Sequence, residues 1–358
     1  MAKDNIPKDF RFDDLQDYQS VISKLNKRPY PKHLIMGNGF SMAYDHKIFS
    51  YNALYDFIDK LQDPTLSQLF EVINTKNFEL VMRQLDNFIE LAKTFDNTEA
   101  MVKALQDANQ RLKESLIDAV SSLHPEHVFA VPDDESQSCY NFLLEYLSNG
   151  GKVFSTNYDL LLYWILMRNN PHSSIDGFGR EHLNPVETRR GEDAEFGELL
   201  WGKYKEEQTV YYLHGTLPIF DTGIEIEKEV YRDSKYLLNN IKERMDNKEY
   251  PIFVTAGNGN EKLNHIYHNR YLTFCYESLS KITGSLVSFG FNFGEYDEHI
   301  IEAVNKAAKR GAQSGDKLFS IYIGVYSKED LEHIKNIQEK FACKVNVYNA
   351  QTANIWRN

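Results

Sequence analysis

Residue types that suit ligand binding and catalysis follow four short apolar runs of the sequence. Glycine, serine, asparagine and histidine are poor core residues but good ligand contacts. The four segments are Gly37-Asn38-Gly39-Phe40-Ser41, Asn157-Tyr158-Asp159, His214-Gly215 and Gly290-Phe291-Asn292-Phe293-Gly294. In an open parallel sheet, ligands bind outside the carboxyl ends of the strands. If the four runs are strands of one such sheet, the four segments converge on one crevice.

The first segment has the glycine spacing of a phosphate-binding turn. Gly37 and Gly39 would let the backbone approach a pyrophosphate without interference from a Cβ atom, and Ser41 would be free to donate a hydrogen bond. A GxG pattern alone is equally typical of an ordinary turn.

Asn157 and His214 are the candidates for chemistry. Asn157 lies between an apolar run and a helix predicted over 160–168, for which Asp159 is the expected N-cap. Its amide could hold a ribose hydroxyl and a water, and a turn-forming asparagine is the alternative. His214 ends the run 210–213, so its imidazole should stand at the rim of the crevice as a general base. A purely structural histidine is the alternative.

The sequence does not predict a metal site. His265 and His268 lie three residues apart on a predicted helix without a third ligand nearby, and Asp297 is most simply the N-cap of a helix over 298–309. The three cysteines, Cys139, Cys275 and Cys343, are isolated from one another in sequence. They cannot supply the thiolates of a structural zinc site, so we expect no metal.

The elements that must position these residues alternate between short apolar runs and helices, as in a doubly wound parallel sheet. The predicted strands are 33–36, 153–156, 210–213, 285–289, 319–325 and 345–348. Residues 31–358 are expected to form one α/β, Rossmann-like domain, preceded by an N-terminal extension over 1–30. Apolar residues at helical spacing indicate a helical insertion over 51–150. The polar stretch 169–208 has little periodicity and is expected to be a long loop or a small subdomain.

The final strands have the clearest connection. Ser327 to Asp330 resembles a capping box, after which a helix to Phe341 is predicted. Together with the strands on either side, this helix makes one βαβ unit.

Composition limits the partners. The 358 residues are 42% hydrophobic and carry 40 Lys and Arg against 52 Asp and Glu, a formal net charge of -12. This charge argues against a nucleic-acid surface as the main function. The sequence begins without an apolar signal region and has no apolar stretch long enough to span a bilayer, and its cysteines are few, so a cytoplasmic location is expected.

The motifs, taken together and in order, resemble those of the sirtuin family. They are Gly37-x-Gly39-x-Ser41, Thr156-Asn157-x-Asp159, Leu213-His214-Gly215 and Ser288-x-Gly290. More narrowly, the chain is similar to the bacterial sirtuin-like proteins of antiviral defence, in which the helical stretch between the first two motifs is often enlarged. The resemblance runs from about residue 31 to 350. Asn38 stands where sirtuins usually have alanine, and the zinc-binding cysteine tetrad is missing.

The resemblance implies an enzyme that binds NAD and cleaves its nicotinamide–ribose bond, depleting NAD in an infected cell. It implies that Asn157 and His214 are the catalytic pair. The implied NAD-binding residues are Gly37, Asn38, Gly39, Phe40 and Ser41 at the phosphates, Asp159 at the nicotinamide end, and Ser288 and Gly290 at the adenosine ribose. A homo-oligomer and a partner protein of the defence system are expected. The alternative is a sensor module that binds NAD or an ADP-ribose derivative without turnover.

Overall fold

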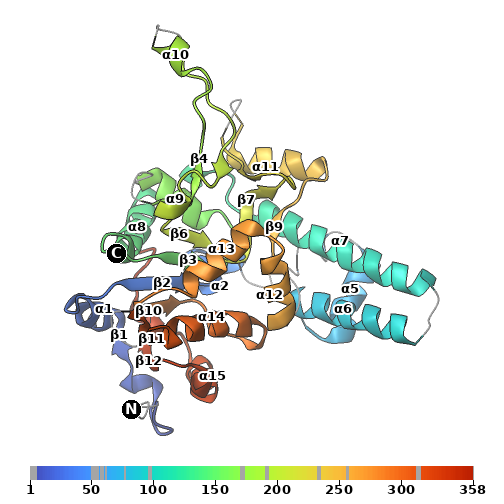
Figure 1. The fold of residues 1–358 in the computed structure, drawn as a ribbon. Coiled ribbons are helices and arrows are strands. Elements are labelled where there is room, and N and C mark those ends of the chain that lie inside the picture. The colour runs from blue at the N-terminus through green and yellow to red at the C-terminus, as the bar shows by residue number, and fades with distance from the viewer. Residues whose placement is uncertain are drawn as a thin grey trace.

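The computed structural model describes residues 6–49, 56, 60, 63–75, 78–95, 99–169, 174–189, 193–231, 235–254, 258–311 and 316–357 (Figure 1). Its centre is a seven-stranded, all-parallel sheet in the order β1-β12-β11-β10-β2-β3-β6. The strands are β1 (Gln16–Asp17), β2 (Lys32–Met36), β3 (Val153–Ser155), β6 (Val210–Tyr212), β10 (Gly284–Phe289), β11 (Leu318–Val325) and β12 (Lys344–Asn349). The predicted α/β, doubly wound parallel sheet is thereby confirmed, because the chain winds from β2 toward β3 and β6 on one side and through β10 to β12 on the other.

Strands β2 and β10 form at short, mainly apolar runs, as expected for strands that are buried on both faces. All five residues of β2 and all six of β10 are buried. These two neighbours pair in parallel with Leu34 opposite Val287.

Helices cover the sheet (Figure 1). Helices α1 (Tyr18–Asn26) and α8 (Asp133–Leu147) pack on strands β12, β2 and β3. Helices α13 (Arg270–Leu279), α14 (Glu298–Lys309) and α15 (Lys328–Ile337) pack on β6 and β11. The capping box at Ser327 is present, with Asp330 as its reciprocal partner. Two further helices, α9 (Leu161–Asn169) and α12 (Gly259–Tyr267), pack on α8 and on α14.

The segment predicted as an N-terminal extension contributes to the sheet. Strand β1 pairs in parallel with β12, and four residues of α1 belong to the main core. They are Tyr18, Val21, Ile22 and Leu25.

The helices between β2 and β3 pack in two different hydrophobic cores. Helices α5 (Pro64–Ile73), α6 (Phe78–Thr94) and α7 (Glu99–Leu123) share a small hydrophobic core of their own and project to one side of the sheet (Figure 1). Helix α8 instead buries Cys139 and Leu143 in the main core. Thr98, the predicted N-cap of the helix that begins at Glu99, lies outside the described residues.

A second, antiparallel sheet was not predicted. It has the order β4-β5-β8-β7-β9. Its strands are β4 (Phe178–Gly179), β5 (Leu200–Trp201), β7 (Gly215–Asp221), β8 (Ile226–Lys228) and β9 (Pro251–Phe253). Between its strands lie the short helix α10 (Pro185–Thr188) and the helix α11 (Leu237–Asp246). The polar stretch 169–208 thus supplies two strands of a small sheet.

None of the helices that the structure describes is long and apolar enough to cross a membrane.

Candidate active-site cleft

The chain reverses its winding direction between β2 and β10, so the topological switch point lies at the carboxyl ends of these two strands. The glycine turn of residues 37–39 follows β2 and leads into the short helix α2 (Asn38–Tyr44). Gly290 follows β10. Doubly wound folds place their ligand sites at this point.

The two turns touch through their glycines. The Gly39 amide donates to the Gly290 carbonyl over 2.9 Å, and Gly290 has φ +63°. A Cβ on Gly39 would lie 2.5 Å from Gly290 Cα. Glycine is therefore required here for the approach of two backbones, a use that the GxG pattern alone does not reveal.

A cleft of about 800 Å³ opens beside this contact. Ligand sites typically enclose about 300–1,000 Å³. The predicted site residues that line the cleft are Asn38, Gly39, Asn157, Asp159, His214 and Gly290. Leu116 and Leu123 of α7 line it as well, as does Phe49 at the end of α3 (His46–Phe49), so the helical insertion forms part of its wall.

The Asn157 side chain is held by a buried network. Its Nδ2 atom donates to Ser41 Oγ over 2.8 Å, and Ser41 Oγ donates to Asp159 Oδ2 over 2.5 Å. Because the one hydroxyl proton of Ser41 goes to the carboxylate, Ser41 must accept from Asn157, which fixes the orientation of the amide. The Asn157 Oδ1 atom is buried and has no partner among the described residues. The network therefore leaves one acceptor of Asn157, a residue that lines the cleft, without a described hydrogen bond.

Asp159 has a raised pKa because its carboxyl group is buried, an effect opposed by the Ser41 hydroxyl and the Leu161 amide. Its second oxygen accepts from the Leu161 amide over 2.9 Å, as expected for the start of α9.

His214 connects the two sheets. It stands between β6 of the parallel sheet and β7 of the antiparallel sheet, and its carbonyl accepts from the Val254 amide over 3.0 Å. Gly215 has φ +82°, and a Cβ there would lie 1.8 Å from the Ile252 carbonyl oxygen. The backbone of His214 is thereby fixed in a tight turn at the edge of the cleft.

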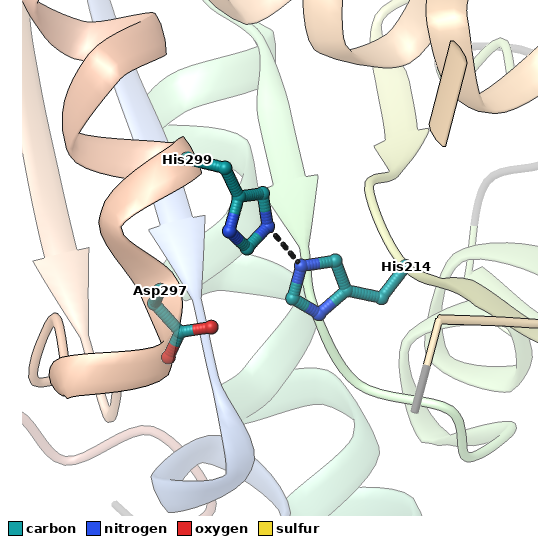
Figure 2. A group of neighbouring side chains, drawn as sticks. All are labelled: His214, Asp297 and His299. Atoms are coloured by element: carbon teal, nitrogen blue, oxygen red, sulfur yellow. Dashed lines mark hydrogen bonds between the residues drawn. The ribbon is translucent and has the colours of Figure 1, made fainter. Parts of the chain in front are cut away.

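The ring of His214 is paired with His299 of α14 (Figure 2). Their Nε2 atoms are 2.8 Å apart, and the rings are inclined by 28°. One carboxylate oxygen of Asp297 and one nitrogen of each ring lie within 4.8 Å of one another. Asp297 stands at the N-cap of α14 but makes no side-chain capping bond, and its Oδ1 atom instead lies 3.3 Å from the buried Lys262 Nζ.

Both histidines are neutral in this environment. The pKa of His214 is lowered well below 6.5 by burial, then by His299 and Lys262. Burial and Lys262 lower the pKa of His299 to about 3. Neutral His214 retains a ring lone pair with which it can accept a proton.

The remaining predicted residues are not among those that line the cleft. Phe40 packs on Trp356, and Ser288 Oγ donates to the Phe291 carbonyl over 2.8 Å. Ser41 and Ser288 are fully buried, and Gly37 is buried where its amide donates to the Phe289 carbonyl over 3.3 Å. Direct NAD contacts by these four residues stay a prediction, and their described contacts are with the protein itself.

Three residues of the site were not identified as such from the sequence: His299, Asp297 and Lys262. Asp297 and His299 directly follow the segment after β10, so their place near the strand's carboxyl end was a usable signal. Lys262 lies on α12, where an isolated lysine gives no indication of burial. His265 on the same helix and His268 directly after it are exposed.

The fold and the cleft define a Rossmann-like α/β protein with a ligand-sized site at its switch point. The chain belongs to the family described as "Domain of unknown function (DUF4917)", whose model matches residues 34–356. No match is found among curated proteins.

Proposed function

We propose that the protein is an NAD hydrolase that cleaves the nicotinamide–ribose bond. The proposal rests above all on one observation: Asn157 and His214, which follow different strands, line the same cleft at the switch point. The motif resemblance to sirtuins names the same pair.

The chemistry suits so sparse a site. The bond between the ribose C1′ and the nicotinamide nitrogen breaks with its electron pair moving to nicotinamide, which leaves as a neutral molecule. No general acid is required for this departure. The site has only to stabilise an oxocarbenium-like ribose and direct a water to C1′.

Two side chains supply what the water needs. The fixed Oδ1 atom of Asn157 accepts a hydrogen bond from the water or from a ribose hydroxyl. Neutral His214 takes the proton that the water loses as its oxygen bonds to C1′. The products are nicotinamide and ADP-ribose. We propose that the protein acts in the cytoplasm as a homo-oligomer. A partner protein would control its depletion of NAD in antiviral defence.

A second candidate is a sensor that binds NAD or an ADP-ribose derivative without turnover. The burial of His214 favours it, because a pKa well below 6.5 makes a weaker base.

Release of nicotinamide from NAD by the purified protein separates the two candidates. His214→Ala and Asn157→Ala should each reduce the release rate by roughly a hundred- to ten-thousand-fold, the usual contribution of a positioned acid–base group. Asn157→Asp is a more specific test of the role of Asn157. It keeps the shape of the side chain but removes the amide donor to Ser41 and adds a negative charge beside Asp159.

If Asn157 only shaped a turn, aspartate would replace it with little loss. Unchanged turnover by His214→Ala would overturn the assignment of His214 as the base, and NAD binding without nicotinamide release by the unaltered protein would establish the sensor. Thermal melting of each variant serves as the folding control.

A further inference from the structure

The His214–His299 pair restricts where the protons of both rings can be. The two Nε2 atoms are 2.8 Å apart, and both side chains are buried. A hydrogen bond between ring nitrogens needs an N–H on one and a lone pair on the other. Since both rings are neutral, one histidine carries its proton on Nε2 and the other on Nδ1.

We propose that His299 is the positioning residue of this site: it accepts the Nε2–H of His214 and so makes Nδ1 of His214 the atom that takes the proton from water. This inference rests on the proposed hydrolase function and extends it to a residue and an atom. Nε2 of His214 is occupied by His299, so Nδ1 is the one ring nitrogen left for the base. Nδ1 has a lone pair only if the proton of His214 is on Nε2, and His299 must then accept it.

The opposite arrangement would disable the base. If His299 donated from Nε2, His214 would carry its proton on Nδ1 and could act toward the cleft only as a donor. In the proposed arrangement the bond to His299 persists through the reaction. Nδ1 gains the proton from water, Nε2–H stays in place, and the hydrogen bond becomes charge-assisted and stronger.

The surroundings of His299 suit a supporting role. It lies in the first turn of α14 and is 2% exposed, so the ring is held by packing. Its Nδ1 atom, which carries the ring proton in the proposed arrangement, is buried without a partner among the described residues, and this costs part of the stability that the hydrogen bond to His214 contributes. The groups that face the pair are Lys262 of α12 and Asp297 of the turn before α14, which form an ion pair with each other. His214 lines the cleft, so His299 acts on a substrate through it.

Substitutions of His299 test the role through kinetics. His299→Leu keeps the bulk but removes the acceptor, and it should lower kcat roughly ten- to a hundredfold, as loss of a group that orients a reactive side chain does. KM for NAD should stay within about twofold, because a positioning group that acts in the chemical step leaves substrate binding intact. His299→Gln can present Oε1 to the Nε2–H of His214, so it should restore most of kcat.

A matched control is His268→Leu, which removes an exposed histidine directly after α12 and should leave both constants unchanged. Unchanged kcat in His299→Leu would overturn the inference. So would a raised KM with kcat intact, or a Gln variant as slow as the Leu variant despite equal melting temperatures.

The tautomer of His214 can also be determined by a measurement that does not depend on NAD turnover. Ring ¹⁵N–¹H correlation spectra of the full chain with ¹⁵N-labelled histidine should show His214 protonated on Nε2 at neutral pH, with its signals assigned by their loss in His214→Gln. A proton on Nδ1 of His214 would overturn the inference even in an active enzyme. If the protein released no nicotinamide but showed the Nε2–H form, the hydrolase would fail and the pairing would stand.

Discussion

At the scale of single residues, the side chains of the cleft are held by hydrogen bonds to other protein side chains. Ser41 and Asp159 hold Asn157 from one side, and His299 holds His214 from the other. Each of the two proposed catalytic side chains therefore enters the cleft in one orientation. Such preorganisation lowers the cost of aligning groups in the transition state.

The pH dependence of turnover follows from the buried state of His214. A base works in its neutral form, so activity is present above its pKa and is lost as the pH falls through that pKa. Because burial, His299 and Lys262 hold the pKa well below 6.5, kcat/KM should still be near its maximum at pH 6.5 and decline only at lower pH.

Lys262→Met should move this acid limb upward, since the positive charge that lowers the His214 pKa is removed. The control Lys281→Met breaks an exposed ion pair with Glu277 and should leave the limb in place. A limb unmoved by Lys262→Met would contradict this electrostatic account. Circular dichroism at each pH separates the limb from acid unfolding.

The prediction that the protein holds no metal is tested most directly at His214, Asp297 and His299, because one possible metal-ligand atom of each residue lies close to those of the other two. Lys262 occupies the carboxylate side of this group, and the two imidazoles bond to each other. A second cation would meet the lysine charge, so we expect no stoichiometric zinc or other transition metal by elemental analysis, and chelators should not slow nicotinamide release. One bound metal per chain, lost in His299→Leu, would refute this.

At the scale of elements, the site depends on how closely two turns approach. The glycine turn after β2 and Gly290 after β10 meet backbone to backbone. Gly39 and Gly290, which make this contact, both line the cleft at the switch point.

Gly290→Ala should therefore destabilise the protein and weaken NAD binding together. A Cβ there would lie 2.5 Å from Gly39 C and Phe40 N, and φ is +63°. Gly223→Ala is the matched control, because Gly223 has φ +82° but open space around the Cβ position.

The control should cost roughly 1–2 kcal/mol from backbone strain alone. Gly290→Ala should lower the melting temperature further and reduce NAD affinity in calorimetry. Equal melting temperatures for the two variants would show that the turns can separate without loss.

At the scale of the whole molecule, the stability of the fold depends on pH through the four buried histidines of the described residues. Burial is the largest cause in each case. It lowers the pKa of His33 to about 4, that of His124 to about 4 and that of His299 to about 3, and lowers that of His214 well below 6.5. In His33, Nε2 donates to the Thr283 carbonyl and Nδ1 accepts from the Lys152 amide, so the neutral ring links the amino-terminal ends of three strands.

Stability should accordingly fall in acid. A folded-state pKa below the unfolded value of 6.5 means that the unfolded chain binds more protons, so the contribution is fully present above pH 6.5 and is lost as the pH falls toward 4 and below. For His33 the loss is of the order of 3 kcal/mol. Chemical denaturation at a series of pH values should show this slope.

His33→Gln should flatten the slope between pH 6.5 and about 4, whereas His268→Gln, at an exposed site, should not. An unchanged slope in His33→Gln would mean that the ring is protonated without cost in the folded state.

The sequence by itself determined six of the seven strands of the main sheet, because a parallel strand that is buried on both faces tends to be a short, mainly apolar run. Residues 33–36 and 285–289 were predicted as strands for that reason. The polar residues that follow each run then had to lie at the same edge of the sheet, where the carboxyl ends of parallel strands meet. The helix over 298–309 was likewise predicted, with Asp297 at its cap position, and the structure has the same bounds.

Only the tertiary structure decided the second sheet and the partners of His214. Strands of two or three residues give no period, and the pairing of Gly215 with Phe253 joins positions far apart in the chain. The contacts of His299 and Lys262 arise where α12 packs on α14. The burial that sets their charges is a property of that packing, and no local pattern of residues encodes it.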